Sequence, residues 1–138
     1  MSRFVLDCSV TMSWGFEDEA AGYPSAILDA LAAGEALVPT IWPLEVANAL
    51  VVAERRKRLT RADTTTFIGI LGRLPIVVIE ESLLRTLVDV LDLSRRTGLS
   101  AYDAAYLHLA AVEGVALATQ DGTMLRAAKR VGVARMRA

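Results

Sequence analysis

The chain has 138 residues, 54% of them hydrophobic, and a formal net charge of -1. That length suits one domain with a sizeable core and is short for two, so we expect a single domain over residues 1–138. A nearly neutral chain is not a polycation that coats nucleic acid. No apolar run reaches the roughly 20 residues of a membrane span, so we expect no membrane partner and attribute the high apolar content to a protein partner.

The N-terminal segment MSRFVLDCSV does not suit a secretory signal, because Asp7 interrupts its apolar stretch early. The single cysteine, Cys8, excludes an internal disulfide and a cysteine-based metal motif. We therefore expect a cytoplasmic protein in which Cys8 is a small buried residue.

Strand and helix patterns alternate along the chain. Residues 3–7 (RFVLD) read as a strand, a helical stretch then ends near Gly34, and residues 36–40 read as a second strand. Pro43 opens a helix, because proline is tolerated at its first position. The rest of the pattern predicts helices over 61–72, 82–97, 98–111 and 123–132, strands over 75–80 and 115–119, and an edge strand over 133–136.

Such alternation is typical of a mostly parallel sheet with helices on both faces. The sequence thus predicts an α/β protein, a three-layer α/β/α domain with four or five strands. In an open parallel sheet the ligand crevice lies at the carboxyl ends of the strands, where the following helices begin.

Four acidic residues fall at this expected place. Asp7 ends the first strand, Asp121 follows the strand at 115–119, and Glu45 and Asp103 lie in the first turns of two helices. Each acid also has a structural interpretation: Asp7 and Asp121 suit helix caps or turns, Glu45 complements a helix dipole, and Asp103 completes a capping box with Ser100.

The structural interpretation weakens when the four acids are taken together. Two unit charges about 4 Å apart interact by roughly 4 kcal/mol at an effective dielectric near 20, and no Lys or Arg adjoins these acids in sequence. A divalent cation would neutralise them, and oxygen ligands without sulfur or imidazole suit Mg²⁺ or Mn²⁺. Such a metal activates water and stabilises the oxygens of a phosphodiester displacement, so we predict phosphodiester hydrolysis.

Four segments, FVLDCSV, PTIWPLEVANAL, LSAYDAAYLHLA and LATQDGTML, in this order and spacing, closely resemble the PIN domain, in particular the small VapC-type toxins of bacterial toxin-antitoxin pairs. The resemblance covers nearly the whole chain. It implies a PIN-like fold and an endoribonuclease that depends on Mg²⁺ or Mn²⁺, cuts an RNA substrate, binds a cognate antitoxin and forms a homodimer. It implies the catalytic acids Asp7, Glu45, Asp103 and Asp121, with Asp7, Asp103 and Asp121 as metal ligands.

The same resemblance gives supporting hydrogen bonds to Ser9 and Thr119, where the family usually has small hydroxyl residues. Helix capping by Ser9 and strand propensity of Thr119 explain them equally well. Two positions depart from the family pattern: Cys8 stands where a smaller or hydroxyl residue is commoner, and Thr123 and Met124 stand where some members carry a further acid. The second departure leaves the occupancy of a second metal open.

Basic residues near the C-terminus are candidates for RNA binding. Arg126, Lys129 and Arg130 follow Asp121 on the predicted helix and would contact phosphates, although a solvated face explains them equally well. The run ERRKR (residues 54–58) is expected to be a solvated face.

The remaining singled-out residues are expected to be structural. His108 follows Asp103 by five residues, about 140° round the helix, and no nucleophile-elbow motif accompanies it. Base stacking by Tyr102 and Tyr106 is the alternative to core packing, which we favour. Core or interface positions are also expected for the larger aromatics Trp14, Phe16 and Trp42.

Two other functions stay open at this stage. One is a housekeeping nuclease that acts on other RNA or on DNA, and the second is a PIN-like module that binds a partner without chemistry. Keeping all four acids favours the enzymes, because an inactive module does not need their mutual repulsion. The absence of an added nucleic-acid-binding domain favours the toxin.

Overall fold

The computed structural model describes residues 2–137, and its four strands form one parallel sheet in the order β3-β2-β1-β4. These strands are β1 (Ser2–Leu6), β2 (Gly34–Pro39), β3 (Ile76–Ile79) and β4 (Ala116–Ala118). The central strands bury both faces of their carboxyl halves, as parallel strands do between two helical layers. The predicted three-layer α/β/α class is confirmed.

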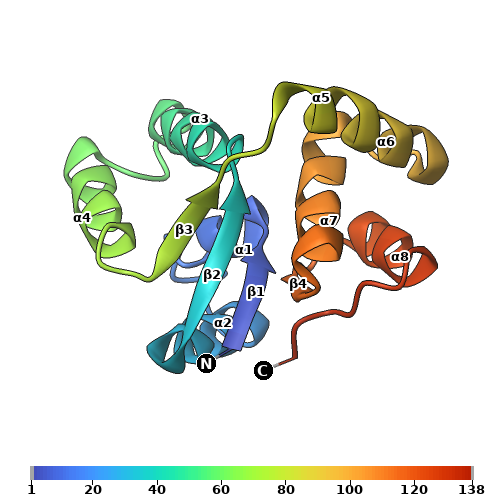
Figure 1. Ribbon diagram of the computed structural model, residues 1–138. Coiled ribbons are helices and arrows are strands. Elements are labelled where there is room, and N and C mark those ends of the chain that lie inside the picture. Colours follow the sequence, from blue (N-terminus) through green and yellow to red (C-terminus); the bar gives the residue numbers. More distant parts are fainter. Residues whose placement is uncertain (1, 138) are drawn as a thin grey trace.

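Helices cover both faces of this sheet. In Figure 1, α1 and α2 lie behind the sheet, and α7 lies on the opposite face, where it contacts β1, β2 and β4. The helices are α1 (Cys8–Ser13), α2 (Tyr23–Ala30), α3 (Trp42–Arg55), α4 (Arg61–Leu71), α5 (Leu83–Arg85), α6 (Leu91–Thr97), α7 (Ala101–Glu113) and α8 (Gly122–Arg130). A 3-10 turn, η1 (Leu31–Ala33), precedes β2, and a π-helical turn, η2 (Thr86–Val90), joins α5 to α6.

The edge strand predicted over 133–136 is wrong. Only an isolated parallel bridge forms there, between Leu117 and Arg135, with hydrogen bonds that join Leu117 to Ala134 and Met136. The three residues of β4 offer little backbone to pair with, because each residue adds only about 3.3 Å of strand. The Arg135 guanidinium instead packs over the Tyr23 ring.

The register of β1 against β4 positions the site. Leu6 pairs with Ala118, and the Asp7 amide extends the ladder by donating to the Ala118 carbonyl oxygen at 3.0 Å. On the other side of β1, Gly34 allows β2 to approach closely, because a Cβ atom there would lie 2.5 Å from the Ser2 carbonyl oxygen. The carboxyl ends of β1 and β4 therefore meet side by side.

Most aromatic residues are placed as expected, with one exception. Tyr106 and Trp42 belong to the core, and Trp14 and Phe16 pack against it while partly buried. Tyr102 is 61% exposed, so the prediction that it packs in the core is wrong. It lies in the first turn of α7, ahead of the buried part of that helix, which begins at Ala104, and it lines an open pocket together with Leu87 of η2.

Within residues 2–137, no helix combines the length and apolar character needed to cross a membrane.

Candidate active site

An open pocket of about 610 Å³ lies at the carboxyl edge of the sheet. All four predicted acids, Asp7, Glu45, Asp103 and Asp121, line it. They come from the end of β1 and from the first turns or caps of α3, α7 and α8. The topology therefore brings together residues that are far apart in sequence.

Asp7 is the buried acid of the pocket, and two hydroxyl groups fix its carboxylate. Its Oδ2 accepts hydrogen bonds from Ser9 Oγ at 2.8 Å and from Thr119 Oγ1 at 2.7 Å. Asp7 occupies the N-cap position of α1, but its side chain makes no cap hydrogen bond. The cap interpretation thus fails for its carboxylate, and both predicted supporting residues contact it.

Glu45 is fixed by a hydrogen bond from a residue of the hydrophobic core. The fully buried Tyr106 donates a hydrogen bond from its hydroxyl to Glu45 Oε1 at 2.5 Å. Burial raises the pKa of Glu45, the Tyr106 hydrogen bond opposes this, and the nearby charges of Asp7 and Asp103 raise the pKa further. Its second carboxylate oxygen, Oε2, has no hydrogen-bond partner among the described residues.

Asp103 stands in the first turn of α7, where Ser100 is the N-cap. The Ser100 hydroxyl accepts from the Asp103 amide at 3.1 Å. At the start of α4, Thr60 and Asp63 form a complete reciprocal capping box; at Ser100 only the forward bond is present within the described chain. Burial raises the pKa of the Asp103 carboxyl, and the charges of Asp7 and Asp121 add to the effect.

Asp121 does serve as a helix cap. Its Oδ1 accepts from the amides of Thr123 at 2.8 Å and Met124 at 3.2 Å, at the N-terminus of α8. The other carboxylate oxygen, Oδ2, stays outside these bonds. Capping and a role in the pocket are therefore compatible for this residue.

Ion pairs do not neutralise the four carboxylates within the part of the chain that the structure describes. Among residues 2–137, no Lys or Arg forms an ion pair with any of them. As the side chains stand, no three acids, histidines or cysteines of this range lie close enough to hold a metal ion together. The pocket thus gathers four acidic side chains that no Lys or Arg of residues 2–137 pairs with.

Cys8 is half-buried rather than fully buried and lines the pocket. Burial raises the pKa of its thiol to about 12, and the charges of Glu45 and Asp7 contribute to the increase. The thiol therefore stays neutral and is a poor nucleophile. Its side chain is a filler of the pocket wall.

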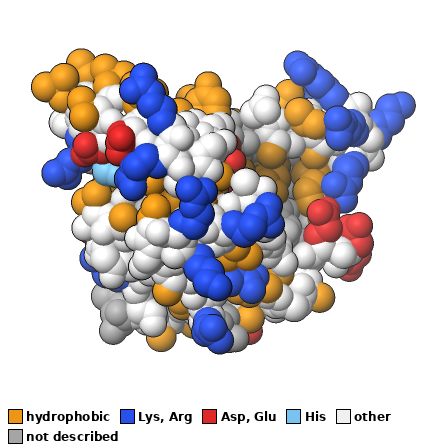
Figure 2. Space-filling model, turned by 90° about the vertical axis from the view of Figure 1, so that its right-hand side faces the viewer, with side chains coloured by type: hydrophobic (Ala, Val, Ile, Leu, Met, Phe, Trp, Pro, Cys, Tyr) orange, Lys and Arg blue, Asp and Glu red, His pale blue; other side chains and the backbone are white. Residues whose placement is uncertain are grey.

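The predicted phosphate-binding residues lie on the exposed face of α8. Figure 2 shows the side of the molecule on which α8 lies, and Lys and Arg side chains gather near the middle of that side. Arg126, Lys129 and Arg130 are exposed; Arg126 contacts Thr123 Oγ1, and Arg130 donates to the Arg96 carbonyl oxygen at the end of α6. None of the three lines the acidic pocket, so their contact with RNA stays a prediction.

His108 lies outside the pocket, in agreement with a structural role. It is buried on α7 with Nε2 3.0 Å from Glu81 Oε2, although the two groups are not aligned as a hydrogen bond.

Sequence reasoning missed several residues of the site, most of them polar. Glu19, Asn48 and Gln120 line the pocket, and Tyr106 positions Glu45. Asn48 lies three residues after Glu45 on α3, a helical spacing that could have indicated it. Glu19 and Tyr106 carried no such signal, since a loop position and an apolar helix face do not reveal a contact partner.

A family model for the PIN domain matches residues 4–130. The chain belongs to the PIN domain family. PIN domains are generally nucleases, and the four segments that suggested the family contribute the four acids of the pocket. No significant match is found among curated proteins.

Three solved structures resemble this PIN domain in fold. PAE2754 from Pyrobaculum aerophilum has a TM-score of 0.70 at 23% identity, over 97% of this chain and 83% of that chain. VapBC2 from Rickettsia felis, bound to a DNA fragment from its promoter, has a TM-score of 0.68 at 12% identity, over 97% of both chains. FitAcB from Neisseria gonorrhoeae has a TM-score of 0.65 at 17% identity, over 97% and 96%. Identities this low establish the fold alone.

Proposed function

We propose that this PIN domain is a metal-dependent endoribonuclease and the toxin of a toxin-antitoxin pair. The observation that carries the proposal is the convergence of Asp7, Glu45, Asp103 and Asp121 on one pocket, where none of the four forms an ion pair with a Lys or Arg of residues 2–137. Carboxylates that line one pocket repel each other, a divalent cation would offset that repulsion, and phosphodiester hydrolysis is the chemistry that such a charged site serves.

The donor set fits Mg²⁺ or Mn²⁺. Asp7 and Asp121 each keep one carboxylate oxygen outside the hydrogen bonds that hold them, and Asp103 lines the same pocket. These three residues would hold the ion, and binding would require their side chains to move closer than they are now. When bound, the metal supplies Lewis-acid activation of water and of the scissile phosphate.

The surrounding residues orient the reacting groups. Ser9 and Thr119 fix the Asp7 carboxylate through Oδ2, and Tyr106 fixes Glu45 through Oε1. Glu45 keeps Oε2 to align the attacking water against phosphorus for an in-line displacement; Oε2 accepts the proton that the water loses as its oxygen bonds to phosphorus, and later returns it to solvent. The leaving oxygen departs on the opposite side with a proton from solvent.

The test is cleavage of a labelled RNA pool by purified protein in Mg²⁺, in Mn²⁺ and in EDTA. We expect discrete products that disappear in EDTA and in the Asp7→Asn and Asp103→Asn variants. Asp29→Asn is the matched control, because Asp29 is exposed on α2 and does not line the pocket. RNA left intact in the presence of metal would contradict the proposal; cleavage of single-stranded DNA alone would favour the alternative nuclease.

The assignment as a toxin is supported by the structural likeness to VapBC2 and FitAcB, which are assemblies of paired proteins. Induced expression in a bacterial host should arrest growth, and the Asp103→Asn variant should not. Coexpression with a small protein encoded immediately upstream should relieve the arrest through a complex that copurifies. Unimpaired growth at the same expression level would contradict a toxin role but not the nuclease.

A homodimer is supported by an unpartnered apolar stripe along α5, η2 and α6. The stripe comprises side chains that are each close to half exposed or more: Leu83, Leu84, Leu87, Val88 and Leu91. Such a contiguous patch marks an interaction site. Glu80 precedes the stripe and Arg95 follows it, both are exposed, and neither forms an ion pair within the described chain. A second copy, packed antiparallel about a two-fold axis, would pair these opposite charges.

A further inference from the structure

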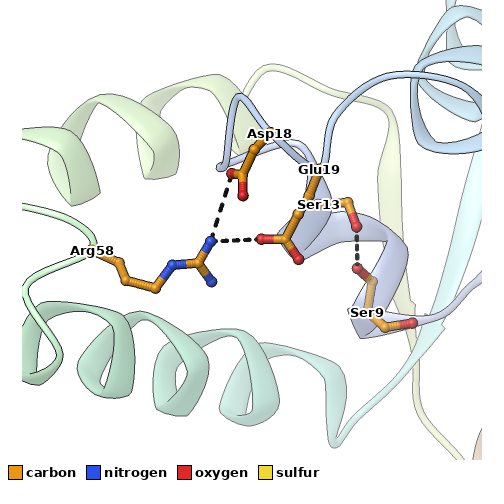
Figure 3. A network of polar contacts seen from close by, with 5 residues as sticks. All are labelled: Ser9, Ser13, Asp18, Glu19 and Arg58. Carbon is orange, nitrogen blue, oxygen red and sulfur yellow. Dashed lines mark hydrogen bonds and ion pairs between the residues drawn. The ribbon is translucent and has the colours of Figure 1, made fainter.

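Arg58 lies beside the acidic pocket and forms an ion pair with one of the residues that line it. Its Nη2 lies 2.8 Å from Glu19 Oε2 and 3.7 Å from Asp18 Oδ1, as Figure 3 shows. Glu19 itself lines the pocket. The guanidinium of Arg58 is therefore one side chain away from the proposed reaction site.

The guanidinium is fixed in place yet accessible. Its carbon lies 3.9 Å from the centroid of the Phe16 ring, which supports one face of the group through a cation–π contact. The side chain remains 44% exposed. A planar guanidinium that is held by stacking keeps its donors oriented toward an anion in solution.

The backbone aims Arg58 in this direction. Lys57 closes α3 in a left-handed conformation with φ 59°, and the Arg58 amide donates to the Ala53 carbonyl oxygen at 2.8 Å. This closure turns the chain so that Arg58 faces the loop of residues 14–22, whereas Arg55, Arg56 and Lys57 are exposed and form no ion pair within residues 2–137. Figure 2 shows a group of basic side chains at its upper right, next to a group of acids.

We propose that Arg58 is a phosphate-binding residue for the RNA strand, and that in the free protein the Glu19 carboxylate occupies its anion site. A carboxylate and a phosphate engage a guanidinium in the same fork geometry, so an incoming phosphate beside the scissile one can replace Glu19. The displaced carboxylate is exposed and returns to water. The inference rests on the proposed function and revises the expectation that residues 54–58 are merely solvated.

The test measures binding rather than cleavage. A short fluorescein-labelled single-stranded RNA is titrated with the Asp103→Asn protein in Mg²⁺, and the anisotropy is followed at several salt concentrations. Adding Arg58→Gln should weaken binding by about fivefold and reduce the salt slope by about one, as loss of a phosphate contact does. Arg73→Gln, which removes an exposed charge at the far end of α4, should change neither.

The Glu19→Gln substitution gives the sharper result. It should strengthen RNA binding by about threefold, because it removes the carboxylate that competes with the phosphate for Arg58. In a protein that already carries Arg58→Gln, the same substitution should increase the RNA affinity much less. Glu17→Gln is the matched control, since it removes the same charge from the same loop without an Arg58 contact.

Three outcomes overturn the inference. The salt slope could be unchanged in Arg58→Gln, Glu19→Gln could bind RNA more weakly, or Glu17→Gln could gain as much affinity as Glu19→Gln. Each of these results would show that the Arg58–Glu19 pair only holds the loop of residues 14–22 in place. Thermal melts of both variants check that the fold is intact. If the parent protein binds no RNA, the proposed function fails along with the inference, whereas normal binding with an unaltered slope rejects Arg58 alone.

Discussion

The Thr119 hydroxyl donates a 2.7 Å hydrogen bond to Asp7 Oδ2 and so joins two residues that are 112 positions apart in the sequence. Both side chains are buried at the adjoining ends of β1 and β4. Replacing Thr119 by Val leaves Asp7 Oδ2 with the Ser9 hydroxyl alone. We expect Thr119→Val to lower the free energy of unfolding by about 1–3 kcal/mol and to reduce cleavage, whereas Thr119→Ser retains both. Urea denaturation measures the first effect, and equal losses in the two variants would contradict it.

The proposed metal site predicts a dependence of stability on metal. In EDTA, Asp103→Asn should be at least as stable as the wild-type protein, because burial and the charges of Asp7 and Asp121 disfavour the ionised Asp103 carboxylate. Added Mg²⁺ should raise the wild-type melting temperature, by an amount equivalent to about 2.7 kcal/mol at a hundredfold excess over Kd. The variant should gain little. A melting temperature that does not respond to Mg²⁺ or Mn²⁺ in wild-type protein would argue against the metal site.

Tyr106 is predicted to act through Glu45. Tyr106→Phe removes the hydroxyl that donates to Glu45 Oε1, and the ring keeps its place in the core. We expect about 1 kcal/mol less stability and a roughly tenfold to hundredfold slower cleavage, as for other residues that orient a ligand or base. Single-turnover kinetics separate this effect from RNA binding, which should be unchanged. A loss confined to binding would assign Tyr106 to the substrate instead.

Lys57 is predicted to store backbone strain. A left-handed conformation costs a residue with a Cβ atom about 1–2 kcal/mol, and glycine adopts it freely. Lys57→Gly should therefore raise the free energy of unfolding by about 0.5–1 kcal/mol, after the greater flexibility of glycine in the unfolded chain is deducted. Lys57→Ala, which removes the same side chain but keeps the Cβ atom, is the control and should not stabilise. A stability ranking with alanine above glycine would refute the strain.

The apolar stripe predicts the oligomeric state. Leu84→Glu places a charge in the middle of the proposed interface and should convert a dimer to a monomer, as sedimentation velocity would show. Ile68→Glu introduces the same charge on α4, at a comparably exposed apolar residue outside the stripe, and should leave the dimer intact. A wild-type protein that sediments as a monomer at all concentrations would contradict the homodimer.

The chain's local sequence determined much of the architecture. Apolar β-branched runs, helix-opening residues such as Pro43 and the terminal glycines mark where elements begin and end, because hydrogen bonding and backbone conformation near those residues are local properties. The alternation of strands and helices then indicates a parallel sheet, in which all strands end at the same edge. Asp7, Glu45, Asp103 and Asp121 all precede or begin helices at that edge. For that reason the four acids could be selected before any distance was known.

Tertiary structure decided what holds those acids and what surrounds them. Three hydrogen bonds each join segments that share no local pattern: Thr119 to Asp7, Tyr106 to Glu45 and Arg58 to Glu19. The exposure of Tyr102 and the single bridge at Arg135 depend on which surfaces pack together in the folded chain, which no window of sequence records. Local propensity acts over a few residues, whereas these contacts exist only after long loops close and distant surfaces pack.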